Sequence, residues 1–370
     1  MIPLYKLSGI LLLLSFCVSP VNAQSNSPKD RLTVTVDFES AKAVCRLLSL
    51  KKVDTTELNR VAGLYGNNLL IQKVKGYSGA GGDVFKKTLK EFIETGAIQG
   101  EDPYNWKLVK LKLPAVNKLI TYLSTNKQAF IDDVRRIIHA FTPATLVAET
   151  KACFLVGGGS LGFTIGNDPT FNVALQKIGN DVEGLKYLVA HELYHSLQDA
   201  GQKLRKKTVA EKPSYQVKAS YYLIYNLWAE GIANFVGDFE KVKMPFEFSK
   251  DQQVLFRKNA ERKVNNFQLF EAMLYRQFND STAKYSQIYD LGFSNTFDES
   301  SYYVGYEMAK KLNQYSGDAT IANLLLEDPI LFSTKYIALY QAHPEDKTFQ
   351  RFSSTIEKIV KELSTWKDKL

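Results

Sequence analysis

Hydrophobic and polar positions along this chain predict many helices and a few short strands. Residues 32–37 alternate apolar and polar side chains, which is typical of a strand. Between residues 40 and 142, apolar residues recur every three or four positions, which predicts a series of helices. Shorter apolar runs predict further strands at 151–156, 163–165 and 171–175. The pattern indicates a mainly helical chain with a strand-rich section near its middle.

Glycine, proline and aspartate residues predict where the helices begin and end. Gly66 and Gly76 are expected to interrupt the helical pattern, and Pro114 is expected to open a helix. Asp181 can cap a later helix, and Gly201 is expected to end it.

A glycine-rich segment, Gly157-Gly-Gly-Ser-Leu-Gly162, matches the G-x-G-x-x-G pattern of dinucleotide-binding sites. Such a site needs a helix directly after the glycines. Phe163-Thr-Ile165 follows instead and is typical of a strand. The segment is therefore predicted to form a glycine-rich hairpin between two strands.

The helix after Asp181 carries the strongest chemical signal, His191-Glu192-x-x-His195. A spacing of four places both imidazoles on one helix face, about 40° apart around the axis. This H-E-x-x-H arrangement predicts that the histidines bind a zinc ion and that Glu192 acts as general base. The sequence has four histidines in all, so the pair is unlikely by chance. The alternative is a surface helix with two solvated histidines.

A catalytic zinc site usually has three protein ligands and one open position. Residues 221–236 form an apolar stretch with a single charged residue, Glu230. A buried carboxylate needs a charged partner or a metal ion, so Glu230 is predicted to be the third ligand. The alternative is a buried glutamate that pairs with an arginine or lysine.

Four other residues compete for a role near the metal. Asp199 lies one turn further along the histidine helix and is expected to hydrogen-bond a ligand's other ring nitrogen, and Glu240 lies in a more charged segment. Asn226 and Asn234 lie four residues on either side of Glu230 and are expected to orient the ligands.

The N-terminus resembles an export signal. Lys6 precedes an apolar run at 10–18, and small residues end at Ala23, after which cleavage is expected. The run is too short for a transmembrane segment, so none is expected after signal removal. The alternative is a lipoprotein anchored at Cys17. The protein is thus predicted to be periplasmic or secreted.

The charge distribution argues against nucleic-acid binding, and the cysteine content allows at most one disulfide after signal removal. The net charge is +8, but its densest basic run, 203–207, has no interleaved aromatic residues, so nucleic-acid binding is not expected. Cys45 and Cys153 remain after signal removal and could pair in an oxidising compartment, although they form no disulfide framework.

The H-E-x-x-H motif followed by Glu230-Gly-Ile-Ala resembles the gluzincin clan of zinc peptidases, and most closely its uncharacterised bacterial families of zinc-dependent peptidases. The resemblance implies an α+β, mainly helical fold with a thermolysin-like zincin core. In such a core a small antiparallel or mixed sheet packs on the H-E-x-x-H helix and a second ligand helix. It also implies one zinc ion per chain. The G-x-M-E-N segment of aminopeptidase members is missing, so exopeptidase specificity is not implied.

A Tyr-x-x-Gly segment at Tyr302 and Gly305 also resembles aminopeptidase-type gluzincins. There the tyrosine donates a hydrogen bond to the tetrahedral intermediate, which implies this role for Tyr302. Tyr303 and Tyr306 are competing candidates, and all three could be packing residues.

Together these features predict a signal peptide at 1–23, a mainly helical region at 24–143 and a zincin-like catalytic domain at 144–370. The predicted function is hydrolysis of a peptide or protein substrate by metal-activated water. Two alternatives remain: a non-catalytic zinc-binding interaction protein, and a zinc hydrolase that acts on a non-peptide bond. The oligomeric state is not predicted.

Overall fold

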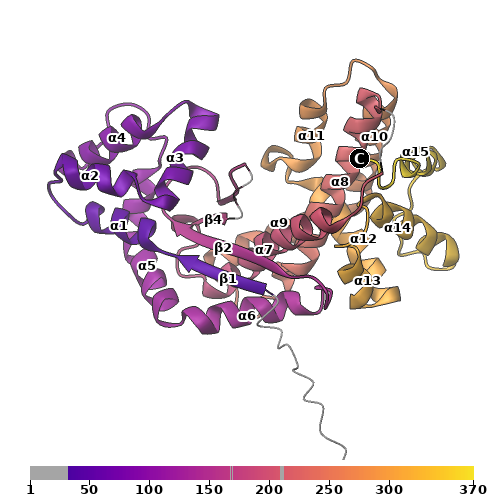
Figure 1. Cartoon of the computed structure of the whole chain (residues 1–370), viewed down its shortest axis with the longest axis horizontal. Helices are drawn as coiled ribbons and strands as arrows, with labels where there is room; N and C mark the ends of the chain where they lie inside the picture. The colour runs from indigo at the N-terminus through magenta and orange to yellow at the C-terminus, as the bar shows by residue number, and fades with distance from the viewer. Residues whose placement is uncertain (1–31, 167, 169, 209–211) are drawn as a thin grey trace, which may run out of the picture.

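A computed structural model describes residues 32–166, 168, 170–208 and 212–370 (Figure 1). The predicted signal peptide and Cys17 lie outside the described residues. The described chain is mainly helical and contains a small mixed sheet, so it has the predicted α+β character. Every helix among the described residues is too short or too polar to span a lipid bilayer.

The sheet has four strands in the order β1-β2-β4-β3. β1 and β2 are parallel, β2 and β4 are parallel, and β3 pairs with β4 in the antiparallel direction. β3 is therefore an edge strand. The bounds are Leu32–Asp37 for β1, Ala148–Leu155 for β2, Gly162–Phe163 for β3 and Thr170–Ala174 for β4.

The predicted hairpin between β2 and β3 is wrong, because β4 lies between these strands. Gly157 and Gly158 adopt positive φ angles of 111° and 74°, which turn the chain away from β2. The side chain of Gln176, which follows β4, accepts a hydrogen bond from Gly157 N at 3.0 Å and donates to Gly157 O at 3.2 Å. These bonds hold the loop so that β3 returns along the far side of β4.

In the described part of the chain six α-helices precede β2, and three of the predicted boundaries among them are wrong. Gly66 and Gly76 lie inside one helix, where a Cβ atom on Gly66 would come within 2.5 Å of Cys153 Sγ in β2. Gly66 thus allows the helix to approach the sheet closely. Pro114 lies inside another helix, which begins earlier, at Trp106, whose N–H donates to the Asp102 carboxylate at 3.0 Å. The helices are α1 (Glu39–Leu48), α2 (Thr55–Ala62), α3 (Tyr65–Ser78), α4 (Gly82–Thr95), α5 (Trp106–Thr125) and α6 (Lys127–His139).

The helices that position the candidate site are α7 (Val182–Leu204), α8 (Tyr215–Val236) and α12 (Ser300–Ser316). Asp181 caps α7 as predicted, because its carboxylate accepts from Gly184 N at 2.7 Å. Gly201 does not end α7: it lies within the helix, where a Cβ atom would clash with the backbone of Leu325. α7 packs against β2, α6 and α8, and α8 packs against α12.

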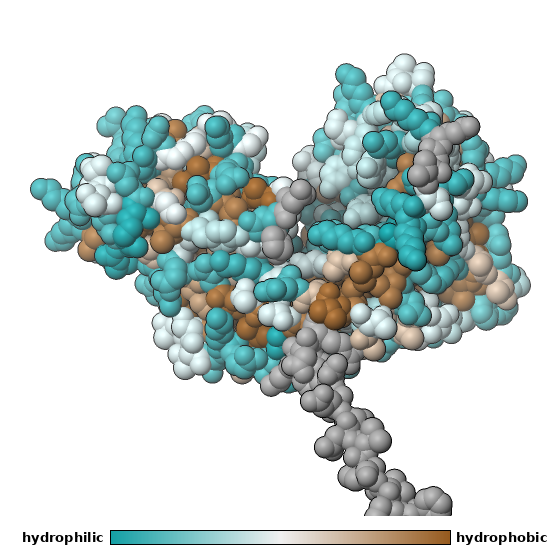
Figure 2. Space-filling view, viewed as in Figure 1, coloured by the Kyte–Doolittle hydropathy of each residue, from teal (hydrophilic) through white to brown (hydrophobic). Residues whose placement is uncertain are grey.

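The remaining helices gather around α8 and α12 (Figure 1). A hollow separates them from the N-terminal helices α1–α4 (Figure 2). Cys45 and Cys153 are buried and unpaired, so the disulfide considered from the sequence is not formed. The remaining elements are η2 (Leu175–Lys177), η3 (Phe239–Lys241), α9 (Glu247–Glu261), α10 (Lys263–Asn279), α11 (Tyr285–Phe293), η4 (Asn295–Phe297), α13 (Asp318–Asn323), α14 (Ile330–Ala342) and α15 (Ser354–Ser364).

A buried carboxylate, Asp328, joins the far ends of α7 and α8 to the C-terminal tail. It accepts hydrogen bonds from Tyr221 in α8 and from Arg205, which follows α7. It also accepts from Asp368 N at 2.8 Å, and Arg205 pairs with the Asp368 carboxylate at 3.2 Å. These contacts fix the ends of the two helices relative to each other.

Candidate metal centre

α7 and α8 bring His191, His195 and Glu230 together. The Nε2 atoms of the two histidines are 3.1 Å apart. Glu230 Oε2 lies 3.3 Å from His195 Nε2 and 3.6 Å from His191 Nε2. Among the described residues, these three form the one group of histidine, cysteine and carboxylate side chains whose ligand atoms could hold a metal ion, all within 4.8 Å of one another.

The donor set fits a zinc ion. Two imidazole nitrogens and one carboxylate oxygen are ligands that zinc prefers, and three protein ligands leave a fourth position open. The three side chains are only 11%, 25% and 17% exposed for His191, His195 and Glu230. Two inward-facing imidazole nitrogens and a carboxylate need a shared proton or a cation between them at this burial.

The charges within the cluster shift its pKa values strongly. Burial alone would lower the pKa of His195, but the charge of Glu230 raises it to about 9. Burial would raise the pKa of Glu230, but the charge of His195 and hydrogen bonds from both histidines hold it well below its usual range. Glu230 is therefore ionised and suited to bind a cation.

Gln198 orients His195, and sequence reasoning missed it. His195 Nδ1 lies 2.8 Å from Gln198 Oε1, and Gln198 Nε2 donates to Ala229 O at 3.0 Å. Since an amide oxygen only accepts, Nδ1 carries a hydrogen, and Nε2 is the ring nitrogen of His195 that faces the cluster. Gln198 is 1% exposed. The signal available in the sequence was its position three residues after His195, which places both side chains on one face of the helix.

The other residues that the sequence suggested near the metal have varied surroundings in the structure. Asp199 lines the surrounding cleft, and Nδ1 of His195 is already bonded by Gln198. Asn226 donates to Tyr222 O and to Tyr285 Oη at 2.6 and 2.7 Å. Asn234 lines the cleft, and Glu240 lies in η3 outside the ligand group. The Asn226 amide is therefore engaged by Tyr222 and Tyr285, whereas the roles expected of Asp199 and Asn234 stay predictions.

Glu192 lies beside the cluster and against the edge strand β3. A Cβ atom added to Gly162 would lie 2.8 Å from Glu192 Oε1 and 3.3 Å from its Cδ. The missing side chain at position 162 thus provides the space that the Glu192 carboxylate occupies. This carboxylate lines the same cleft as the two histidines.

Three tyrosines of α12 line the cleft, and their surroundings differ. Burial, followed by the charge of Glu230, raises the pKa of Tyr302 well above its ordinary value, and Glu192 acts in the same direction. The ring of Tyr303 packs on Phe256, with centroids 5.8 Å apart. The hydroxyl of Tyr306 donates to Asp238 Oδ2 at 3.1 Å. Among the three, Tyr302 is the one whose pKa responds to both Glu230 and Glu192.

Residues 58–345 match the protein family described as "Putative zinc dependent peptidase (DUF5700)". The chain belongs to this family. The match covers every residue of the cluster, together with Glu192 and Tyr302, and a family of zinc-dependent peptidases agrees with the donor set. No curated protein and no solved structure matches the chain.

In this family member the group formed by His191, His195 and Glu230 opens into a cleft of about 1270 Å³. Residues from both sides of the hollow in Figure 2 line it, from Lys73 in α3 to Tyr302 in α12. Its volume exceeds that of most small-molecule pockets. The cleft therefore has room for an extended peptide segment.

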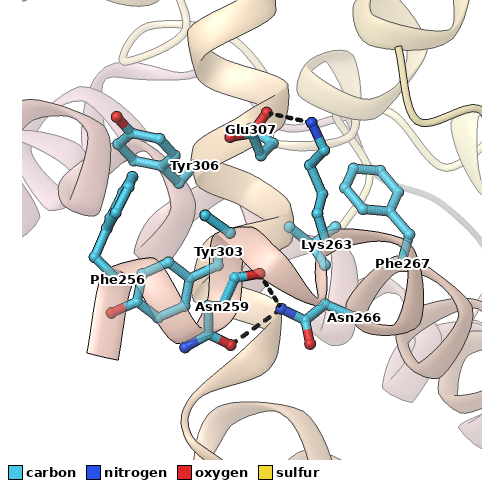
Figure 3. A pocket seen from close by; sticks show the side chains of 10 residues that line it. Phe256, Asn259, Lys263, Asn266, Phe267, Tyr303, Tyr306 and Glu307 are labelled. Atoms are coloured by element: carbon cyan, nitrogen blue, oxygen red, sulfur yellow. Dashed lines mark hydrogen bonds and ion pairs between the residues drawn. The ribbon is translucent and has the colours of Figure 1, made fainter. Parts of the chain in front are cut away.

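A second cavity lies beside α12 and is not a candidate site (Figure 3). Its volume is about 10 Å³, which is no more than one water molecule needs. Its polar side chains pair with each other: Lys263 with Glu307 at 3.5 Å, and Asn266 with Asn259 at 3.0 Å. These contacts join α9, α10 and α12 and have a structural role.

Proposed function

We propose that this family member is a gluzincin-type peptidase in which His191, His195 and Glu230 hold one zinc ion. The observation that carries the proposal is the convergence of two imidazole nitrogens and an ionised carboxylate within 4.8 Å. The small sheet that contacts α7, with α8 packed beside that helix, supports a thermolysin-like core.

Glu192 is the general base in this proposal. When bound, zinc supplies Lewis-acid chemistry, polarising the scissile carbonyl and lowering the pKa of water toward neutrality. Glu192 accepts a proton from the attacking water and passes it to the leaving amine. The position of its carboxylate beside β3 supports this role, because Gly162 has no side chain and leaves space for the carboxylate.

Tyr302 is the proposed donor to the charge that develops on the carbonyl oxygen. Because burial and nearby carboxylates raise its pKa, its hydroxyl keeps its proton and can donate. A donor aimed at this developing charge stabilises the transition state.

Export of the protein is part of the proposal. It rests on the sequence of residues 1–23, with a basic residue, an apolar run and a small-residue cleavage site. A cell-fractionation experiment on the full chain tests it, and retention of the uncleaved protein in the cytoplasm would contradict it.

The decisive experiment for the activity compares wild type with Glu192→Gln. Glu192→Gln should retain about one zinc ion per chain, measured by elemental analysis, and should lose hydrolysis of a diverse peptide mixture followed by mass spectrometry. Wild-type protein that binds zinc but cleaves none of these peptides would refute the peptidase proposal.

A further inference from the structure

Glu299 is a carboxylate in the active-site cleft that the proposed mechanism does not use. It occupies the N-cap position of α12, three residues before Tyr302, and it lines the cleft together with His191 and Glu230. Its side chain is outside the group of ligand atoms that converge on the metal position. A role as a further zinc ligand is therefore not supported by the geometry.

The backbone holds Glu299 in an unusual conformation. Asp298 and Glu299 have φ angles of 58° and 52°, in the left-handed region that most L-residues avoid. Glu299 N donates to Ser294 O at 3.1 Å, and Asn259 Nδ2 donates to Asp298 O at 3.1 Å. Two consecutive residues of this kind persist only where surrounding contacts fix them, and such strain is common at functional sites.

The two adjacent acidic side chains have different surroundings. Asp298 pairs with Lys258 at 2.7 Å and with Arg262 at 2.9 Å, and it does not line the cleft. Within the described part of the chain, no hydrogen bond or ion pair involves the Glu299 carboxylate. Burial raises its pKa. The charge of nearby His191 opposes this shift, but a partly buried carboxylate with no hydrogen bond or ion pair is still unfavourable, and a cation in the cleft would relieve this.

The rest of the cleft is also acidic, although the whole chain has a net charge of +8. Its lining includes Glu149, Asp199 and Asp238, whereas its lysines among the described residues are Lys73 and Lys203. The excess of acidic side chains is thus local to the cleft and differs in sign from the net charge of the whole chain. It favours the approach of positively charged substrates.

We propose that Glu299 determines specificity by binding a cationic group of the substrate, an ammonium or a guanidinium, close to the scissile bond. This inference rests on the proposed peptidase function. The cation can come from the amino terminus of the substrate or from a lysine or arginine side chain. Either source would form a charge-assisted hydrogen bond with the carboxylate.

The test uses zinc-loaded protein and a series of quenched fluorescent peptides built on one cleaved sequence. Each position carries lysine, arginine or uncharged norleucine in turn, with a free or acetylated amino terminus. Wild type should show a kcat/KM at least about tenfold higher for cationic peptides, and Glu299→Gln should reduce this preference to less than about threefold. Loss of the preference on acetylation identifies the amino terminus, and loss on norleucine substitution identifies a side chain.

Asp298→Asn is the matched control, because it removes the neighbouring charge, which does not face the cleft, and asparagine tolerates a positive φ. It should keep the preference for cationic peptides. An equal fall in kcat/KM for charged and neutral peptides in Glu299→Gln would overturn the inference, as would a wild type without charge preference.

A binding measurement separates this inference from the proposed activity. The affinity of labelled cationic and norleucine peptides is measured by fluorescence anisotropy on Glu192→Gln and on the double variant with Glu299→Gln. Tighter binding of the cationic peptide that disappears in the double variant supports Glu299 even if wild type cleaves nothing. Equal affinities in both backgrounds refute the role of Glu299 and leave the peptidase proposal standing.

Discussion

Gly231 and Gly305 contact each other directly where α8 crosses α12. A Cβ atom on Gly305 would lie 2.6 Å from Gly231 Cα, and one on Gly231 would clash with Gly305 Cα. Glu230 directly precedes the first glycine, and Tyr302 lies three residues before the second. The close crossing therefore sets how near Tyr302 lies to Glu230, the proposed third metal ligand.

Gly305→Ala is expected to force the two helices apart. Overpacking of this kind should lower the free energy of unfolding by about 1–3 kcal/mol, because backbone atoms cannot move aside as a side chain can. Misplacement of Tyr302 should lower kcat/KM by up to roughly 100-fold. Thermal unfolding and peptide kinetics measure the two effects.

The control for this variant is Gly76→Ala, also inside a helix. A Cβ atom on Gly76 would have nothing within 4 Å, so this substitution should stabilise the protein by about 0.5–1 kcal/mol. Wild-type kinetics and stability in Gly305→Ala would show that the close crossing is unnecessary.

Gln198→Leu tests the orientation of His195. The substitution removes the acceptor for Nδ1–H and leaves Ala229 O without its donor, so zinc affinity should fall roughly 10- to 100-fold. Competition with a chromophoric chelator measures this affinity. Asp199→Asn is the control and should retain wild-type affinity; an equal loss in both variants would contradict the assignment to Gln198.

Gly162→Ala tests the position of Glu192. The new Cβ atom would occupy the space of the Glu192 carboxylate, so kcat should fall while zinc content stays the same. Gly159→Ala, in the loop that precedes β3, is the control, because its Cβ atom would make an ordinary 3.4 Å contact with Tyr77 Oη. Unchanged kcat in Gly162→Ala would show that the carboxylate can shift without cost.

Phenylalanine substitutions distinguish the three tyrosines of α12. Tyr302→Phe should lower kcat about 100- to 1,000-fold at constant zinc content, because one donor to the developing charge is lost. Tyr303→Phe should have little effect on kcat. Tyr306→Phe should cost about 1 kcal/mol of stability through its lost bond to Asp238. A dominant kinetic effect of either neighbour would reassign the role.

Several features could be predicted from the sequence because their signals are local. The strand at 32–37 has the predicted bounds, and His191 and His195 share a helix face, which their spacing alone determines. Glu230 was recognisable as the single charge in the apolar stretch 221–236, and the structure places it beside both histidines. Its role as a zinc ligand remains a prediction.

Other features depend on partners distant in sequence and could not be predicted. Gly66 and Gly201 resemble helix breaks in the sequence, but their roles are set by close contacts with Cys153 and Leu325. The strand order depends on pairing between remote segments. No pattern in the neighbouring sequence marked Glu299 as a cleft residue, because its conformation depends on contacts made by the preceding loop and by α9.

The buried Asp328 connects the two helices of the candidate metal centre to the C-terminal tail. Because Arg205, Tyr221 and Asp368 meet on this carboxylate, the tail joins the two helices that carry the proposed zinc ligands, at a distance from those side chains. Fraying of the tail would release both helices at once. Loss of the metal and melting of the C-terminal region should therefore occur in a single thermal transition.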